Sequence, residues 1–298
     1  MTGAQDIINI ERIEMNNDFG LYIVATPIGN LGDISDRAIT TIREGDLIIC
    51  ENPKHSLKLL NKLGIKKKLI SLHDYNEKGV ISKVSKEFLN KKIAFISDAG
   101  SPLISDPGFK FLQYSISNNF KISSVPGATA LIPGLQLSGI PINRFNFLGF
   151  FPKNTSDMKE FINEIKTSET TTVFYVSSHK VKKCLEFIEE EMEDRLISIA
   201  KELTKINERV IRGTVIEIKN QLMKNKASLK GEFVIVVEGT SLKKSRTINN
   251  IELYNEEIKK LLSKFSLTDV VEIVHKLTGI TKNKIYKWAL ELKKSQVL

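Results

Sequence analysis

Cysteine, histidine and long apolar runs are scarce in this sequence of 298 residues. Its two cysteines, Cys50 and Cys184, lie far apart, which excludes a disulfide framework and a cysteine-rich zinc site. The four histidines are scattered, so we expect no metal site. No apolar run approaches the roughly 18 residues that a membrane helix needs, and residues 1–18 lack the apolar stretch of a secretion signal. We therefore expect a soluble protein of a reducing compartment, the cytoplasm.

Familiar catalytic motifs are also missing. The sequence has no G-x-G-x-x-G, no P-loop, no H-E-x-x-H and no G-x-S-x-G, so it offers no motif for a dinucleotide enzyme, a P-loop NTPase, a zinc protease or a serine hydrolase. What is present is an ordinary globular composition, 41% hydrophobic and 27% charged. The length predicts two domains.

Positive charge gathers at the end of the chain. The net charge is +9, and residues 241–298 hold 12 Lys and Arg against 6 Asp and Glu, which is +6 of that total. A basic segment behind a nearly neutral body indicates an anionic partner, with nucleic acid first. The alternative is a general preference for lysine, because only 8 of the 44 basic residues are arginine.

Apolar, β-branched runs alternate with segments of helical periodicity in the first half of the chain. This alternation predicts a mostly parallel α/β sheet, with ligands at the carboxyl ends of its strands. The expected strands are 21–26, 46–50, 68–73, 92–97 and 121–125, and the expected helices are 33–43, 53–63, 80–89, 107–117 and 128–137.

The alternation pauses around residues 149–155 and then resumes, so we place a domain boundary there. A second α/β unit is expected to have strands 171–176, 196–200, 208–212 and 232–237, and helices 180–190 and 215–223. Three helices should follow, 251–265, 268–277 and 282–293, and Trp288 is expected to be a packing residue. The predicted parts are an N-terminal extension (1–19), an N-terminal α/β domain (20–150), a second α/β domain (151–240) and a basic helical C-terminal extension (241–298).

Three loops rich in Gly, Pro and Asp follow predicted strands, at residues 26–33, 97–108 and 125–130. Glycine lets a backbone approach a ligand closely, and proline stiffens a loop. Each loop alone also fits ordinary turn chemistry; Asp106-Pro107, for example, is a typical helix start. Three such loops at one edge of a sheet favour a small polar cofactor there.

The motifs in these loops resemble those of a known family. They are TPIGNLGDIS (26–35), SDAGSPLISDPG (97–108), PGATA (126–130), FYVSSHK (174–180), KELTK (201–205), RGT (212–214) and KGEFVIVVEG (230–239). In this order they resemble the ribosomal RNA small-subunit methyltransferase I family, within the tetrapyrrole-methylase-like class III superfamily. That resemblance implies two α/β domains with a cofactor cleft between them, and 2′-O-methylation of a cytidine ribose in the decoding region of 16S rRNA.

Two motifs depart from the family pattern. Glu-Asp-Thr-Arg, which the family usually has after the second strand, is Glu51-Asn52-Pro53-Lys54 here. The family's Ser-x-His-Arg is Ser177-Ser178-His179-Lys180. Lysine lacks the planar fork of arginine, and Asn52 removes a carboxylate, so the target or the rate could differ from those of the family.

The resemblance also implies a set of site residues. The S-adenosylmethionine bed would comprise Pro27, Asp98, Ala99, Gly100, Leu103, Ser105, Ala128, Thr129, Tyr175, Val176, Leu203 and Val237, although strand core is an alternative for Tyr175, Val176 and Val237. Glu51, Asp106 and Glu202 are candidates for the base that takes the 2′-hydroxyl proton, with helix caps and surface ion pairs as their alternatives. The implied partners are 16S rRNA in the small ribosomal subunit and a second copy of the chain, as a homodimer. A tetrapyrrole or diphthine-type methyltransferase and a non-catalytic RNA-binding protein remain alternatives.

Overall fold

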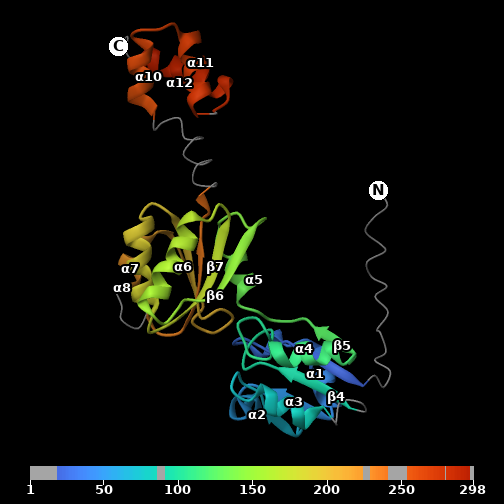
Figure 1. Cartoon of the computed structure of the whole chain (residues 1–298). Coiled ribbons are helices and arrows are strands. Elements are labelled where there is room, and N and C mark those ends of the chain that lie inside the picture. Colours follow the sequence, from blue (N-terminus) through green and yellow to red (C-terminus); the bar gives the residue numbers. More distant parts are fainter. Residues whose placement is uncertain (1–18, 86–90, 224–228, 241–253, 279, 296–298) are drawn as a thin grey trace. The chain divides into compact units, whose positions relative to one another are not determined.

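The computed structural model describes residues 19–85, 91–223, 229–240, 254–278 and 280–295 (Figure 1). The chain divides into two compact units. The first comprises residues 1–133 and 202–208, and the second comprises 134–201 and 209–298. The short segment 202–208 therefore belongs to the first unit although the sequence on both sides of it belongs to the second.

The first unit is built on a parallel sheet with the strand order β3-β2-β4-β1-β5. Helices α1 and α2 pack on one face of this sheet, and α3 and α4 pack on the other, so the unit has three layers. Its elements are β1 (Gly20–Val24), η1 (Leu31–Asp33), α1 (Asp36–Glu44), β2 (Leu47–Cys50), α2 (Pro53–Lys62), β3 (Leu69–Ser71), α3 (Glu77–Val84), β4 (Lys92–Ile96), α4 (Phe109–Ser117) and β5 (Ile122–Val125).

The parallel sheet of the first unit confirms the sequence prediction and has a simple cause. The central strands β2 and β4 are buried almost throughout, as continuous apolar runs require when helices cover both faces of a sheet. Local signals start the helices between them: the side chain of Ser35 accepts a hydrogen bond from the Ala38 amide at the start of α1. Part of the predicted helix 80–89 lies outside the described residues.

The second unit has a mixed sheet with the order β6-β7-β10-β8-β9, in which only the β6–β7 pair is parallel. Helices α6, α7 and α8 share one hydrophobic core with one face of the sheet (Figure 1). The elements are α5 (Leu131–Gln136), which runs across the division between the units, β6 (Phe145–Phe150), α6 (Thr155–Thr167), β7 (Thr171–Ser177), α7 (Val181–Met192), β8 (Leu196–Lys201), β9 (Arg209–Thr214), α8 (Val215–Met223) and β10 (Glu232–Val237).

The sequence did not predict β6 or α6. β6 is an edge strand with exposed ends and a glycine, Gly149, at a φ of +69°, so it lacks the alternation and burial that mark a strand. It precedes the predicted boundary at 150/151 and yet belongs to the second sheet, while the compact units divide at 133/134. The four-part division of the chain stays a prediction that limited proteolysis would test.

Three C-terminal helices share a hydrophobic cluster of their own: α10 (Asn255–Leu262), α11 (Leu267–Thr278) and α12 (Lys282–Ser295). Trp288 packs against this cluster, and its indole N–H donates to the Asn255 side chain at 2.6 Å, which confirms the packing role expected for it. Residues 251–253 of the first predicted helix lie outside the described residues. Among the helices that the structure describes, none combines the length and apolarity needed to cross a bilayer.

Candidate cofactor site

The three predicted loops come together at the carboxyl edge of the first sheet. Thr26 and Gly100 pair through their backbones, with N···O distances of 2.8 and 3.0 Å, which joins the loop after β1 to the loop after β4. The Ser101 hydroxyl donates to the Ala128 carbonyl at 3.2 Å, which joins the loop after β5. The expectation that these loops share one edge is therefore met.

The loop after β4 is held in an unusual backbone conformation. Gly100, Leu103 and Ser105 have φ values of +83°, +72° and +67°. Left-handed backbone costs roughly 1–2 kcal/mol at a residue with a side chain, and such residues gather at ligand-binding sites. The Ser97 hydroxyl, which is buried, donates to the Gly100 carbonyl at 3.1 Å and so braces the turn.

Segment 202–208 lies beside the loop after β1. A Cβ added to Gly29 would stand 2.4 Å from Cγ of Lys205 and 3.2 Å from the Leu203 carbonyl, so only glycine fits there. Leu203 is buried, and its neighbour Thr204 has a φ of +64° and a buried hydroxyl without a hydrogen-bond partner. Glycine at position 29 thus lets segment 202–208 pack directly on the loop after β1.

Three carboxyl groups gather beside these loops and influence one another. Burial, followed by the charge on Glu51, raises the pKa of Asp106 to about 6. Burial, followed by the charges on Asp98 and Asp74, raises the pKa of Glu51 above its ordinary value. Mutual repulsion among Glu51, Asp98 and Asp106 makes this edge favourable for a positively charged ligand.

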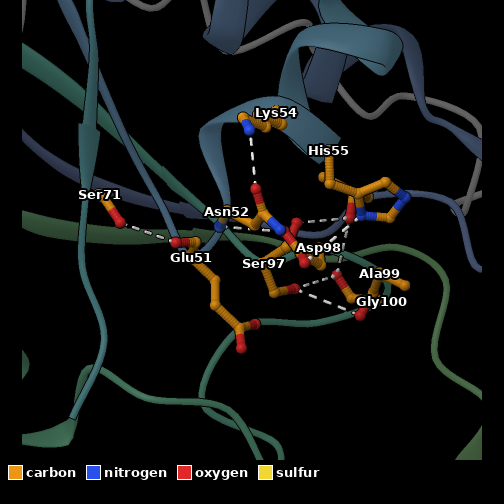
Figure 2. A network of polar contacts seen from close by, with 10 residues as sticks. Glu51, Asn52, Lys54, His55, Ser71, Ser97, Asp98, Ala99 and Gly100 are labelled. Carbon is orange, nitrogen blue, oxygen red and sulfur yellow. Dashed lines mark hydrogen bonds and ion pairs between the residues drawn. The ribbon is translucent and has the colours of Figure 1, made fainter.

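Asp98 occupies the centre of a polar network (Figure 2). One carboxylate oxygen accepts from the Asn52 amide at 3.2 Å, and the other lies 3.5 Å from Nδ1 of His55. Neither His55 nor Ser97 was among the site residues predicted from the sequence. The position of His55 could have indicated a site residue, because it lies on the first turn of the helix that follows the Glu51 motif.

The two departures from the family pattern have structural explanations. Asn52 is the N-cap of α2, since its side chain accepts from the Lys54 amide at 3.1 Å, and Pro53 takes the first helical position. Asparagine therefore keeps the capping function of an aspartate while removing its charge. Nζ of Lys180 donates a single hydrogen bond to the Phe151 carbonyl at 3.1 Å, a contact that needs no guanidinium fork.

The remaining predicted site residues have other surroundings. Val176 and Val237 are buried in the core of the second unit, so their side chains pack against protein, and Tyr175 contacts Phe147 and Phe150. Glu202 pairs with Lys205 at 3.0 Å. The roles of all predicted site residues stay predictions. No group of three or more metal-binding side chains occurs among the described residues.

Comparison with known proteins assigns the chain to a family. The sequence model of the tetrapyrrole (corrin/porphyrin) methylases matches residues 20–219. The chain belongs to this family. Proteins named ribosomal RNA small subunit methyltransferase I are similar to it over most of their lengths. The protein from Haemophilus influenzae is 38% identical across 91% of this chain and 96% of its own, and that from Escherichia coli O157:H7 is 32% identical across 93% and 96%. The resemblance stated from the motifs is confirmed, and the chain is a methyltransferase.

Solved structures of the tetrapyrrole methylase family support the fold. A diphthine synthase matches with a TM-score of 0.59 at 14% identity, over 74% of this chain and 89% of its own. A cobalt precorrin-4 methyltransferase matches with a TM-score of 0.54 at 17% identity, over 74% and 95%. At such low identity these structures are evidence for the fold alone, and they confirm the predicted α/β architecture.

Proposed function

We propose that this tetrapyrrole methylase family member transfers a methyl group from S-adenosylmethionine to a cytidine 2′-oxygen in the decoding region of 16S rRNA, within the small ribosomal subunit. The observation that carries the proposal is the similarity to methyltransferases named for small-subunit ribosomal RNA, which covers 91% of this chain. The tetrapyrrole alternative is supported by the description of the family as a whole, and the solved structures of a diphthine synthase and a precorrin methyltransferase are below 20% identical.

The cofactor would lie on the three loops of the first unit, where the residues present fit it. Backbone groups at Gly100 and Ala128 and the small side chain of Ala99 would contact the adenine and ribose. The carboxylates of Asp98 and Glu51 repel each other's charge, and a cationic ammonium or sulfonium group would relieve that repulsion. When bound, S-adenosylmethionine supplies an activated methyl group.

Asp106 is the strongest of the three candidate bases. Its pKa of about 6 lies near working pH, which suits a group that must be ionised and still accept a proton. Glu51 raises that pKa and would act through Asp106. Glu202 is held by Lys205, which favours a supporting role for it.

Methyl transfer to isolated small ribosomal subunits tests the proposal. Subunits from a strain lacking this protein would be incubated with it and radiolabelled S-adenosylmethionine, and the modified nucleotide would then be mapped by mass spectrometry. We expect one methyl group on the ribose of a decoding-region cytidine. Label on another nucleotide, or on the base, would contradict the assigned position. Cofactor binding without transfer would favour the non-catalytic alternative.

A further inference from the structure

Three aromatic rings form a cluster at the carboxyl end of the parallel β6–β7 pair. The register between these strands shifts between Phe147 and Phe150, and Gly149 has a φ of +69° within the shift. The rings of Phe147 and Phe150 therefore both contact the Tyr175 ring edge to face. The centroid distances to Tyr175 are 5.0 Å for Phe147 and 5.2 Å for Phe150. Phe150, on the edge strand of the sheet, remains 56% exposed. A large apolar ring that is braced from the side and open to solvent is available to stack on a ligand.

Lysines lie next to this cluster. Phe151 follows Phe150 directly, its amide donates to the Tyr175 carbonyl at 2.8 Å, and its carbonyl accepts from Nζ of Lys180 at 3.1 Å. Lys153 is exposed two residues further on. Burial, followed by the charge on Lys153, lowers the pKa of Lys180. The two ammonium groups therefore repel each other in the free protein, and an anion beside them would relieve the repulsion.

The backbone at the same edge adds to this positive character. Lys180 is the N-cap residue of α7 and makes no side-chain capping bond, and the first turn of α7 contains no acidic residue. The amides at such a helix start carry partial positive charge. Lys183, on that first turn, donates to the Thr155 hydroxyl at 3.1 Å and so connects the start of α7 to the start of α6.

We propose that Phe150 stacks on an unpaired base of the RNA substrate while Lys153 and Lys180 contact the adjacent phosphate. Exposed aromatic rings beside cations are the usual means of holding single-stranded nucleic acid, and bases of RNA that is read by protein are commonly splayed out onto such rings. The inference rests on the proposed RNA substrate. In this proposal Tyr175 supports the Phe150 ring. The contact of Tyr175 with the cofactor, predicted from the family resemblance, is not part of the proposal.

Variants of Phe150 test the stacking. Phe150→Leu keeps an apolar side chain of similar size and removes the aromatic face, whereas Phe150→Trp keeps that face. The matched control is Phe145→Leu, which changes a 39% exposed phenylalanine at the other end of β6. Affinity for a short single-stranded RNA, and the KM for small ribosomal subunits, would be measured with each full-length protein. We expect Phe150→Leu to weaken RNA binding at least about fivefold, the lower end of what one stacked base contributes, and the other two variants to bind as the unaltered protein does.

Lys153→Ala tests the phosphate contact, with Lys182→Ala on α7 as its control. Removing one neutralised phosphate should make the slope of log affinity against log salt shallower by about 0.7. Equal RNA affinity in Phe150→Leu and the unaltered protein would overturn the proposal. A loss of S-adenosylmethionine affinity in Phe150→Leu with RNA affinity unchanged would also overturn it and would assign the ring to the cofactor. If the unaltered protein binds RNA through Phe150 but transfers no methyl group, the proposed function fails and the stacking proposal stands.

Discussion

Gly100, in the loop after β4, is constrained by its backbone conformation and by its neighbours. Its amide and its carbonyl both pair with Thr26, and its φ of +83° is one that residues with a side chain rarely adopt. A Cβ there would also stand 3.3 Å from Cγ2 of Ile28. The conformation favours glycine at this position, and the tight contact with Ile28 leaves little room for a larger side chain.

Gly100→Val should therefore abolish S-adenosylmethionine binding. The matched control is Gly64→Val, because Gly64 has a similar φ of +66° and no atom within 4 Å of an added Cβ. We expect both variants to lose about 1–2 kcal/mol of stability from backbone strain, and only Gly100→Val to lose the cofactor. Titration calorimetry and thermal melts of both proteins check this. Unchanged cofactor affinity in Gly100→Val would contradict the location of the site.

Asp106 gives the reaction a predictable dependence on pH. A base with a pKa of about 6 is protonated below that pH, so the methylation rate should fall as the pH is lowered through 6. Asp106→Asn should reduce the rate by roughly 10²–10⁴-fold and remove this limb of the profile. Glu160→Gln, on an exposed position of α6, is the control. A limb that persists in Asp106→Asn with only a small loss of rate would assign the titration to another group.

The stability of the same variant gives a readout that does not depend on activity. Because the pKa of Asp106 is raised from 3.8 to about 6, the folded protein binds this proton more tightly than the unfolded chain does. The free energy of unfolding therefore falls as the pH rises from about 4 to 6. Asp106→Asn removes this penalty. We therefore expect the difference in melting temperature, variant minus unaltered protein, to be larger at pH 8 than at pH 4.

At the scale of elements, what could be predicted depended on burial. The five strands of the first sheet were predictable because helices cover both faces and leave continuous apolar runs. β6 was not, because an edge strand with exposed phenylalanines gives no such run. The second sheet was expected as another α/β unit, and its mostly antiparallel pairing has no local signature in the sequence.

The candidate site was predictable in part for the same reason. Parallel strands end at one edge, so the gathering of the three loops followed from the strand order alone. The contact of His55 with Asp98 joins side chains more than forty residues apart in the sequence. The hydrogen bond from Ser97 to Gly100 depends on the conformation of a strained turn. Neither has a local sequence signal. The aromatic cluster depended on a register shift in a strand that was not expected.

The charge distribution of the whole molecule leads to a prediction about RNA affinity. Residues 241–298 hold +6 of the net charge of +9. Their three described helices have a core of their own, so removing them should leave the loops of the first unit intact. We expect the truncated protein to bind cofactor normally and to bind small subunits more weakly. Its salt slope should be shallower by about 0.7 for each phosphate that these helices neutralise in the full-length protein.

Binding measured at several salt concentrations, beside the melting temperatures of both proteins, decides between two roles for these helices. An identical salt slope with a lower melting temperature would mean that their lysines face water and that the helices only support the rest of the protein.

The position of segment 202–208 also affects the order in which the protein can fold. The first unit takes its last residues from a stretch of chain that follows residues 134–201 of the second unit, and Gly29 is fitted closely against Leu203 and Lys205. During synthesis, residues 1–133 can form their sheet early, but the loop after β1 must wait for its neighbour until more than two hundred residues have been made. The cofactor loops would therefore reach their final form late, after β6, β7 and β8 of the second sheet have been made and before β10, which joins β7 to β8, has been made.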